Sequence, residues 1–391
     1  KSVTLKPGAY ILPKGIIVAG NGVTIEAKGV TLVGTGQAQA VWARNVKDLT
    51  IRGLEAQRYR WGIKVRGGEN VVVEGCRIRD TAEEAPADGV WLDVWRKPEE
   101  AYGAAILLWD VKGGRVAAND VQHQQNGVSL YDCTKMTVEG NNASFQSGWG
   151  IHLYGSSDNV IQDNLADWCD RIHKRGERYY YPGADAAGML MIWNSSRNIV
   201  RRNMFRGGGD GVFIAGYHAP DANVPCNDNV FEDNDCSYSP NNAFESTFCK
   251  GNLFRNNRAS MSNYGFWLGY STDNVVEGNE VRRNRIAGIA VEHGLRNTYA
   301  GNLLSGNSRG IALWSRSGAG FAAAFPEQAA SAENIIKDNT FTANGVGFLS
   351  RRDGDDPVAN PRKDTFIGNV FYGNGTGALL MTSDSAVFRG N

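Results

Sequence analysis

Three carboxylate side chains stand in short apolar segments that also carry aromatic residues. Asp210 precedes an apolar run, Glu245 follows Phe244, and Glu292 ends the run 288–292. Enzymes that cleave glycosidic bonds commonly use two carboxyl groups that flank the bond, and apolar surroundings raise the pKa of the one that donates a proton. We therefore interpret Glu245 as the candidate proton donor, with Glu292 or Asp210 as its partner.

Aromatic and histidine side chains near these carboxylates could bind a sugar. Flat rings stack on sugar faces, and rows of exposed rings on one surface indicate a binding site. Each residue also has a structural interpretation: Asp210 and His293 as turn residues, Glu245 as a solvated strand carboxylate, and Tyr217 and His218 as packing residues of a loop. The candidates for substrate binding are Trp193, Phe213, Tyr217, His218, Trp267, His293, Trp314, Tyr154 and His152.

The candidates belong to a chain that repeats a unit of about 22 residues. Three copies follow one another between 243 and 302, and they close on Asn257, Asn279 and Asn302, which are 22 and 23 residues apart. A fixed period of this length indicates stacked supersecondary units. Longer gaps elsewhere mark inserted loops. The same closing residue is found at Asn119, Asn141, Asn164, Asn203, Asn234, Asn339, Asn369 and Asn391.

Each repeat is predicted to consist of short strands. Apolar and polar residues alternate in 150–154 and in 288–292, with the period of two that is typical of strands. Two or three strands per repeat, joined at Gly and Asn, make one rung of a parallel β-helix. A leucine-rich repeat has a similar period, but its L-x-x-L-x-L frame is missing. Asn tolerates left-handed corners, so we expect one stack of Asn141, Asn164, Asn203, Asn234, Asn257, Asn279 and Asn302.

The sequence predicts one all-β domain over residues 1–391, with about 14 rungs and an irregular start or cap in 1–60. Long loops on a rigid scaffold commonly carry function. In this sequence the long loops come just before or after the first strand of a rung. They should therefore form the walls of a groove, and the outer face of that strand should form its floor. The insertions lie near 77–105, 165–187, 215–229, 315–332 and 350–363.

Strand alternation assigns the floor of this groove. Ile151 and Leu153 should point into the coil, so His152 and Tyr154 point outwards. The same alternation, applied to the next rung, predicts that Met191 faces outwards. Backbone geometry places the Cα atoms of the two glutamates about 10–12 Å apart, which favours inversion over retention. The deepest pocket is expected to have a floor of Trp193, Phe213, Glu245, Trp267 and Glu292.

Composition excludes several classes of protein. The chain has 41 basic and 41 acidic residues, so it lacks the positive charge of most nucleic-acid binders. No apolar run reaches 18 residues, so we expect no membrane span. The six cysteines form no C-x-x-C pair, which argues against a zinc or thioredoxin site, and we expect no metal or cofactor. Cys226 and Cys236 could form a disulfide or remain buried thiols.

The start of the sequence bears on localisation. No signal peptide is visible, and the first residue is Lys1 rather than Met, which we interpret as a mature or trimmed form. This interpretation fits a secreted or periplasmic protein. The oligomeric state is left undefined by the sequence.

The stacked G-I-x-L and N-x-I-x-x-N units, from about Trp61 to Asn391, resemble the right-handed parallel β-helix repeats of carbohydrate-binding proteins and sugar hydrolases, including NosD-like proteins. The resemblance implies a right-handed coil and a carbohydrate ligand. It does not select one activity, because this fold carries many. Gly209-Asp210-Gly211 matches one fragment of the polygalacturonase motifs, while the other fragments and the alginate epimerase signature are missing.

We therefore expect a glycoside hydrolase acting on an extracellular poly- or oligosaccharide. One alternative is a polysaccharide lyase or epimerase on uronic-acid glycans, with a base among Tyr217, His218, His152 and His293 and a cation from the loop 171–178. The other alternative is a non-catalytic carbohydrate-binding or NosD-like protein.

Overall fold

The computed structural model describes residues 2–84, 91–175, 179–183, 185–220, 222–318, 320–321 and 324–391. Residues 176–178, part of the loop expected to supply a cation, lie outside the described residues, as do 85–90 of the first insertion. The chain divides into two compact units, unit 1 (Lys1–Asp210) and unit 2 (Gly211–Asn391). The single domain expected from the sequence stays a prediction.

Strands build unit 1, and β5, β6 and β8 are longer than the short strands expected from the sequence. Its elements are β1 (Ser2–Thr4), β2 (Gly8–Ile11), β3 (Ile16–Val18), β4 (Thr24–Val33), β5 (Gln39–Gln57), β6 (Trp61–Glu74), β7 (Arg77–Arg79), the 3₁₀ turn η1 (Pro98–Glu100), β8 (Ala104–Ala117), β9 (Val128–Tyr131), β10 (Thr134–Glu139), β11 (Trp149–Tyr154), β12 (Val160–Gln162), β13 (Ile172–Arg175), β14 (Tyr179–Pro182), β15 (Ala187–Ile192) and β16 (Ile199–Arg201).

Unit 2 continues with the same kind of strands. β17 (Asp210–Ala215) starts at the last residue of unit 1. The remaining elements are β18 (Tyr217–His218), β19 (Ala222–Asn223), β20 (Val230–Glu232), β21 (Asn242–Thr247), β22 (Leu253–Arg255), β23 (Tyr264–Trp267), β24 (Val275–Glu277), β25 (Glu280–Arg282), β26 (Ala287–Glu292), β27 (Thr298–Ala300), β28 (Leu303–Ser305), β29 (Arg309–Arg316), η2 (Pro326–Gln328), β30 (Ile335–Lys337), β31 (Thr340–Thr342), β32 (Val346–Asp353), η3 (Pro357–Ala359), β33 (Thr365–Ile367), β34 (Val370–Tyr372), β35 (Thr376–Leu380) and β36 (Val387–Arg389).

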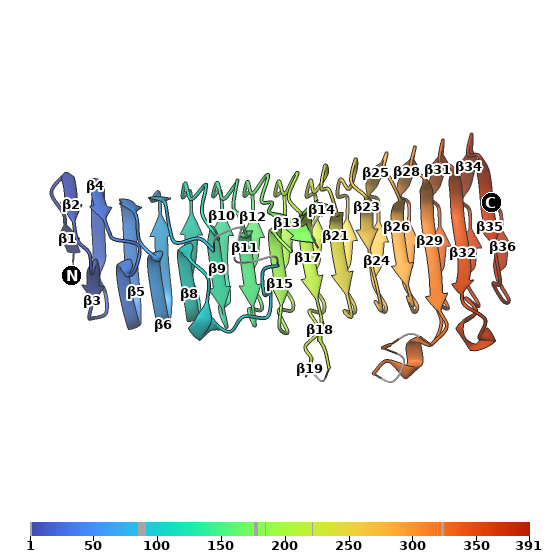
Figure 1. The fold of residues 1–391 in the computed structure, drawn as a ribbon, viewed down its shortest axis with the longest axis horizontal. Helices are drawn as coiled ribbons and strands as arrows, with labels where there is room; N and C mark the ends of the chain where they lie inside the picture. The colour runs from blue at the N-terminus through green and yellow to red at the C-terminus, as the bar shows by residue number, and fades with distance from the viewer. Residues whose placement is uncertain are drawn as a thin grey trace. The chain divides into compact units, whose positions relative to one another are not determined.

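Equivalent strands pair in parallel from rung to rung, which confirms the parallel β-helix within each unit. In unit 1, Ile151 pairs with Val128 on one side and Met189 on the other, and in unit 2 Phe244 pairs with Phe266. We call the first strand of each rung strand 1 and its outward side the front face. In unit 2, strand 1 is carried by β21, β23, β26, β29, β32 and β35, which lie side by side (Figure 1).

Inward-pointing apolar side chains fill the coil. Phe231 stacks on Phe254 with ring centroids 5.0 Å apart, and Phe244 stacks on Phe266 at 4.9 Å. All four rings are fully buried, and burial of each such side chain contributes about 1.5–3 kcal/mol. The six cysteines are buried thiols, so the buried-thiol alternative holds for Cys226 and Cys236. No helix in the described residues is long and apolar enough to cross a membrane.

The predicted asparagine stack is confirmed within each unit. Asn257 accepts hydrogen bonds at Oδ1 from the backbone and side-chain nitrogens of Asn234, at 2.9 and 3.1 Å. Its Nδ2 donates to Oδ1 of Asn279 at 3.1 Å and to the carbonyl of Phe231 at 2.9 Å. The same pattern joins Asn119, Asn141, Asn164 and Asn203 in unit 1 and continues through Asn302, Asn339, Asn369 and Asn391 in unit 2.

Further ladders run at other corners, and they were not predicted from the sequence. In unit 2, Asn334 donates from Nδ2 to the Oδ1 atom of Asp364 at 3.0 Å, so an acid ends one of these ladders. Asp364 is 1% exposed, and burial raises its pKa to about 7. The second ladder of unit 2 includes Asn229, Asn252, Asn274, Asn297 and Asn334, and the third Asn284, Asn307, Asn344 and Asn374.

One register predicted from the sequence is wrong. Met191 pairs with Leu153, which points into the coil, so Met191 also points inwards. Leu190 and Ile192 are the outward residues of β15, in line with His152 and Tyr154. The error arose because residues 189–192 are apolar without interruption, and alternation therefore gives no register there.

Candidate functional site

The front face of unit 2 carries its outward side chains in straight rows, because the strands pair in register. Glu245 pairs with Phe213 on one side and Trp267 on the other, and Trp267 pairs in turn with Ala290. A second row, two residues further along each strand, contains Glu292, Trp314 and Arg351. Neighbours within a row are about 4.8 Å apart, so each side chain contacts those of the adjacent rungs.

Glu245 lies half-buried between two aromatic neighbours. Its strand β21 presents Glu245 outwards because Phe244 and Ser246, on either side, are buried in the coil. The Nδ2 atom of Asn242 donates a 2.6 Å hydrogen bond to Oε2 of Glu245, which fixes the orientation of the carboxylate. The location agrees with the proton-donor role that we proposed, although that role itself stays a prediction.

Glu292 lies in a different environment from Glu245. Its side chain is 16% exposed, and the Nε atom of Arg316 lies 3.4 Å from Oε1. Burial raises the pKa of Glu292, while the charge of Arg316 opposes this shift and that of Asp353 adds to it. Glu245 and Glu292 are thus two rungs and two residues apart on one face, the offset from which we estimated their spacing.

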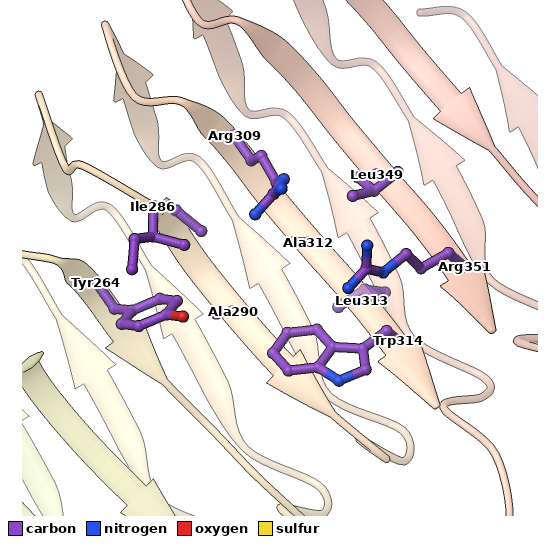
Figure 2. Close-up of a pocket in the computed structure, with 10 residues that line it drawn as sticks. Tyr264, Ile286, Ala290, Arg309, Ala312, Leu313, Trp314, Leu349 and Arg351 are labelled. Carbon is purple, nitrogen blue, oxygen red and sulfur yellow. The ribbon is translucent and has the colours of Figure 1, made fainter. Parts of the chain in front are cut away.

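A cleft of about 80 Å³ lies further along the same face (Figure 2). Its floor consists of the small side chains Ala290 and Ala312, and the ring of Trp314 stands at one side. Figure 2 shows the guanidinium groups of Arg309 and Arg351 turned toward the space above Ala312. The remaining lining residues are Tyr264, Ile286, Ala287, Leu313 and Leu349.

The residues expected to form the floor of the deepest pocket do not line this cleft. The closest link is Trp267, whose ring centroid is 5.3 Å from that of Trp314 and 4.9 Å from that of Tyr264. Trp314 was a candidate from the sequence, whereas Tyr264, Arg309 and Arg351 were not. Tyr264 and Arg309 each begin a strand 1, and Arg351 lies near the end of one, in the polar run 350–353, so a polar residue at a strand end was the available signal.

The candidate His293 has a structural role in this arrangement. Its Nδ1 atom lies 2.7 Å from the carbonyl of Gln328, and its Nε2 atom accepts a hydrogen bond from the backbone nitrogen of Arg316 at 2.9 Å. Nδ1 therefore carries the proton, and the ring ties β29 to the turn η2. Burial lowers the pKa of His293, and its ring stacks on Tyr270 with centroids 4.7 Å apart.

Tyr217 and His218 form the short strand β18 beside a wider hollow. The ring of Tyr217 packs against Phe248 and Phe325, at 5.4 and 5.3 Å, and its hydroxyl donates to the carbonyl of Pro220. His218 is exposed. The hollow has a volume of about 330 Å³ and is lined mainly by residues of turns and loops, including Asn223, Pro225, Phe248, Lys250, Tyr270, Asp273, Arg296, Phe325 and Glu327.

The candidates of unit 1 lie beneath a covering segment, residues 91–103, which we call the roof. Trp61 donates from Nε1 to the carbonyl of Tyr102 at 2.9 Å, and the Tyr102 ring packs on Trp149 at 5.7 Å. Trp193 follows β15, stacks on Tyr154 at 5.4 Å and meets Trp95 of the roof at 6.3 Å. The outward side chains of β9, β11 and β15 are buried in this part of unit 1.

His152 is fully buried under this roof. Its ring lies 4.6 Å from that of Trp149 and 5.0 Å from that of Tyr131, and neither ring nitrogen has a hydrogen-bond partner among the described residues. Burial lowers the pKa of His152 to about 3, so the ring is neutral near pH 7. The third carboxylate, Asp210, is 2% exposed at the end of unit 1.

Two family models match the chain. The model described as "Right handed beta helix region" matches residues 104–247 and 194–325, which together cover more than half of the sequence. The model described as "Periplasmic copper-binding protein (NosD)" matches residues 9–167. No curated protein matches the sequence.

Solved structures with a similar fold include an alginate lyase and a tailspike protein. The alginate lyase AlyF-OU02 is 12% identical, with a TM-score of 0.52, and the match covers 95% of this chain and 82% of that chain. The Dettilon tailspike protein is 13% identical, with a TM-score of 0.51 and coverage of 89% and 61%. At these identities the likeness concerns the fold and does not assign an activity.

Proposed function

The chain belongs to the right-handed β-helix family, and from this premise we propose that it is a carbohydrate-active enzyme that binds a polysaccharide along the front face of unit 2. The observation that carries the proposal is the partly exposed carboxyl group of Glu245 beside the partly exposed ring of Trp267. Aromatic rings provide stacking surfaces for sugar rings, and the carboxyl group beside them can exchange a proton with a bound sugar.

Hydrolysis of a glycosidic bond is the reaction that we propose for this face. Glu245 donates its proton to the leaving glycosidic oxygen while a water molecule attacks the anomeric carbon. Glu292 accepts a proton from that water, and exchange with solvent restores both groups. The offset of two rungs and two residues leaves room for the water, as inverting enzymes require. Burial raises the pKa of Glu292, which makes its carboxylate a stronger base, and the charge of Arg316 partly opposes this shift.

Copper binding, which the description of the NosD family names, is not part of this proposal. The described residues contain no group of three or more His, Cys, Asp or Glu side chains that could hold a metal ion. Within the matched range, Cys76 and Cys133 are buried, and burial raises their pKa to about 11 and 12, which disfavours the thiolate that binds copper. We also propose that the protein acts outside the cytoplasm, where polysaccharide substrates occur.

The test is a screen of the wild-type protein and Glu245→Gln against a panel of polysaccharides. We expect the wild type to release new reducing ends from at least one glycan and Glu245→Gln to release almost none. The matched control is Glu277→Gln, which removes a carboxylate from β24, where Glu277 pairs with Arg255 at 2.7 Å, instead of from strand 1. It should retain wild-type turnover.

Other outcomes identify the alternatives. Products that absorb in the ultraviolet indicate a lyase, because elimination leaves an unsaturated sugar end. Binding without any product would contradict the enzyme proposal and favour a carbohydrate-binding protein. Full activity in Glu245→Gln would remove Glu245 from the mechanism.

A further inference from the structure

We propose that the cleft formed by Tyr264, Arg309, Trp314 and Arg351 binds an anionic sugar residue, so that the polysaccharide recognised by this protein is acidic. The inference rests on the proposed function only in taking the ligand to be a sugar chain. The shared chemistry is a single anionic group on a pyranose, either a uronate carboxylate or a sulfate ester.

The first argument is the unbalanced charge of the cleft. Its lining contains two arginines and no acidic residue. Arg309 is half-buried, and its guanidinium makes no ion pair or hydrogen bond with any of the described residues. Its N–H donors therefore stay available, and a bound carboxylate or sulfate can accept two parallel hydrogen bonds from them.

Arg351 adds a second positive group at the other side of the cleft. Asp353 engages its Nε and Nη2 atoms, at 3.1 and 3.2 Å, and holds the side chain in place. Because a guanidinium has five N–H donors, this contact leaves donors for a ligand. The other nearby acid, Glu292, is paired with Arg316, so neither acid neutralises Arg309.

The second argument is the shape and chemistry of the cleft. Ala290 and Ala312 keep its floor low and apolar, while Trp314 provides an aromatic face for a sugar ring (Figure 2). A volume of about 80 Å³ is small beside the roughly 300–1,000 Å³ of pockets that enclose a whole ligand. The cleft therefore fits the anionic substituent of one sugar, and the rest of the glycan lies along the open face.

The third argument is the position of the cleft relative to Glu245. Ala290 pairs with Trp267, and Trp267 pairs with Glu245, so the alanine floor of the cleft begins one rung beyond Trp267, a step of about 4.8 Å. Tyr264 lines the cleft from the strand of Trp267 itself. The anionic sugar residue thus binds on the side of Glu245 that carries Glu292, because Ala290 and Glu292 lie two residues apart on β26. We expect the cleft to determine which glycan is selected.

Calorimetry on the Glu245→Gln background, which prevents turnover, tests this assignment. The probes are a galacturonate hexamer, its fully methyl-esterified form and a sulfated galactan hexamer. We expect the galacturonate or the sulfated hexamer to bind at least about 10-fold more tightly than the neutral ester. Adding Arg309→Gln should lower this preference by about 10-fold, and the preference should weaken at high salt.

The control is Arg283→Gln, which removes an exposed arginine from another part of unit 2 and should preserve the preference. Binding of only the galacturonate assigns a carboxylate, and binding of only the sulfated probe assigns a sulfate. Equal binding of all three probes, or an undiminished preference in a folded Arg309→Gln variant, overturns the inference. An Arg309-dependent preference without turnover in the wild type would instead overturn the enzyme proposal alone.

Discussion

The front faces of the two units have the same backbone plan, but equivalent outward positions differ in their exposure to solvent. In unit 1 the outward residues Ser129, His152 and Tyr154 are 1%, 0% and 4% exposed, because the roof covers them. In unit 2 the outward residues Glu245 and Trp267 are partly exposed. An outward position on a strand therefore does not define a binding residue. The loop above it decides whether the side chain meets a ligand or packs as in a core.

The largest expected effect is the loss of catalytic activity when Glu245 on the front face of unit 2 is replaced. Glu245→Gln on the open face should lower kcat/KM by about 100- to 10,000-fold, the range expected for loss of a general acid. Its free energy of unfolding should change by no more than about 0.5 kcal/mol, because the side chain lies outside the core. Turnover assays and urea denaturation check the two parts. A comparable loss of activity in His152→Phe would break the contrast between the faces.

The next prediction concerns acid stability of unit 1. His152 has a pKa of about 3 in the folded protein, well below its ordinary value, so the unfolded chain binds a proton that the folded chain does not. Stability should therefore fall as the pH decreases from about 6.5, with a loss of about 3 kcal/mol by pH 4. Denaturation curves between pH 4 and 8 measure the slope, which His152→Phe should reduce. An unchanged slope would show that the roof does not shield the ring.

Unit 2 should respond to pH in the opposite direction. The pKa of Asp364 is raised to about 7, so the folded protein holds a proton that the unfolded chain releases. This contribution is present at low pH and is lost as the pH rises toward 7, by about 2 kcal/mol between pH 5 and 7. Asp364→Asn keeps an acceptor for Asn334 and should raise stability at pH 8. Lower stability of this variant at pH 8 would contradict the assignment.

The smallest effect is expected from loosening the roof. The backbone nitrogen of Asp93 donates to the Tyr102 hydroxyl at 2.9 Å, and Tyr102→Phe removes this bond at a cost of about 1 kcal/mol. Hydrogen exchange in residues 91–103 should become faster, while exchange in the asparagine ladders stays slow. If exchange in the roof is unchanged, the hydroxyl does not hold the segment closed.

The fold could be predicted from sequence because its determinants are local and periodic. The spacing of Asn257, Asn279 and Asn302 defined the rung, and alternation placed Glu245, Trp267 and Glu292 on one outward face. The outward side chains of β15 could not be predicted, because its apolar residues run without interruption. Alternation reports which way a side chain points only when the two sides of the strand differ in polarity.

The roof and the arginine cleft depend on contacts that no local pattern encodes. Tyr102 meets Trp61 across 41 residues of sequence, and that contact turns an outward face into an interior. Arg309 and Arg351 are separated by an inserted loop and two further strands, and only the pairing of β29 with β32 brings them to one cleft. Long-range packing of this kind requires the structure.

The asparagine ladders give each unit a polarity. Along the ladder from Asn234, every side-chain amide accepts from the rung before it and donates to the rung after it. The amide dipoles are therefore aligned head to tail, and each bond polarises the next. Where such a row ends at Asp364, it directs its positive end at the carboxyl group. A stack that is uniform in shape is thus electrically directional, and inserting a rung would lengthen each row of dipoles without reversing it.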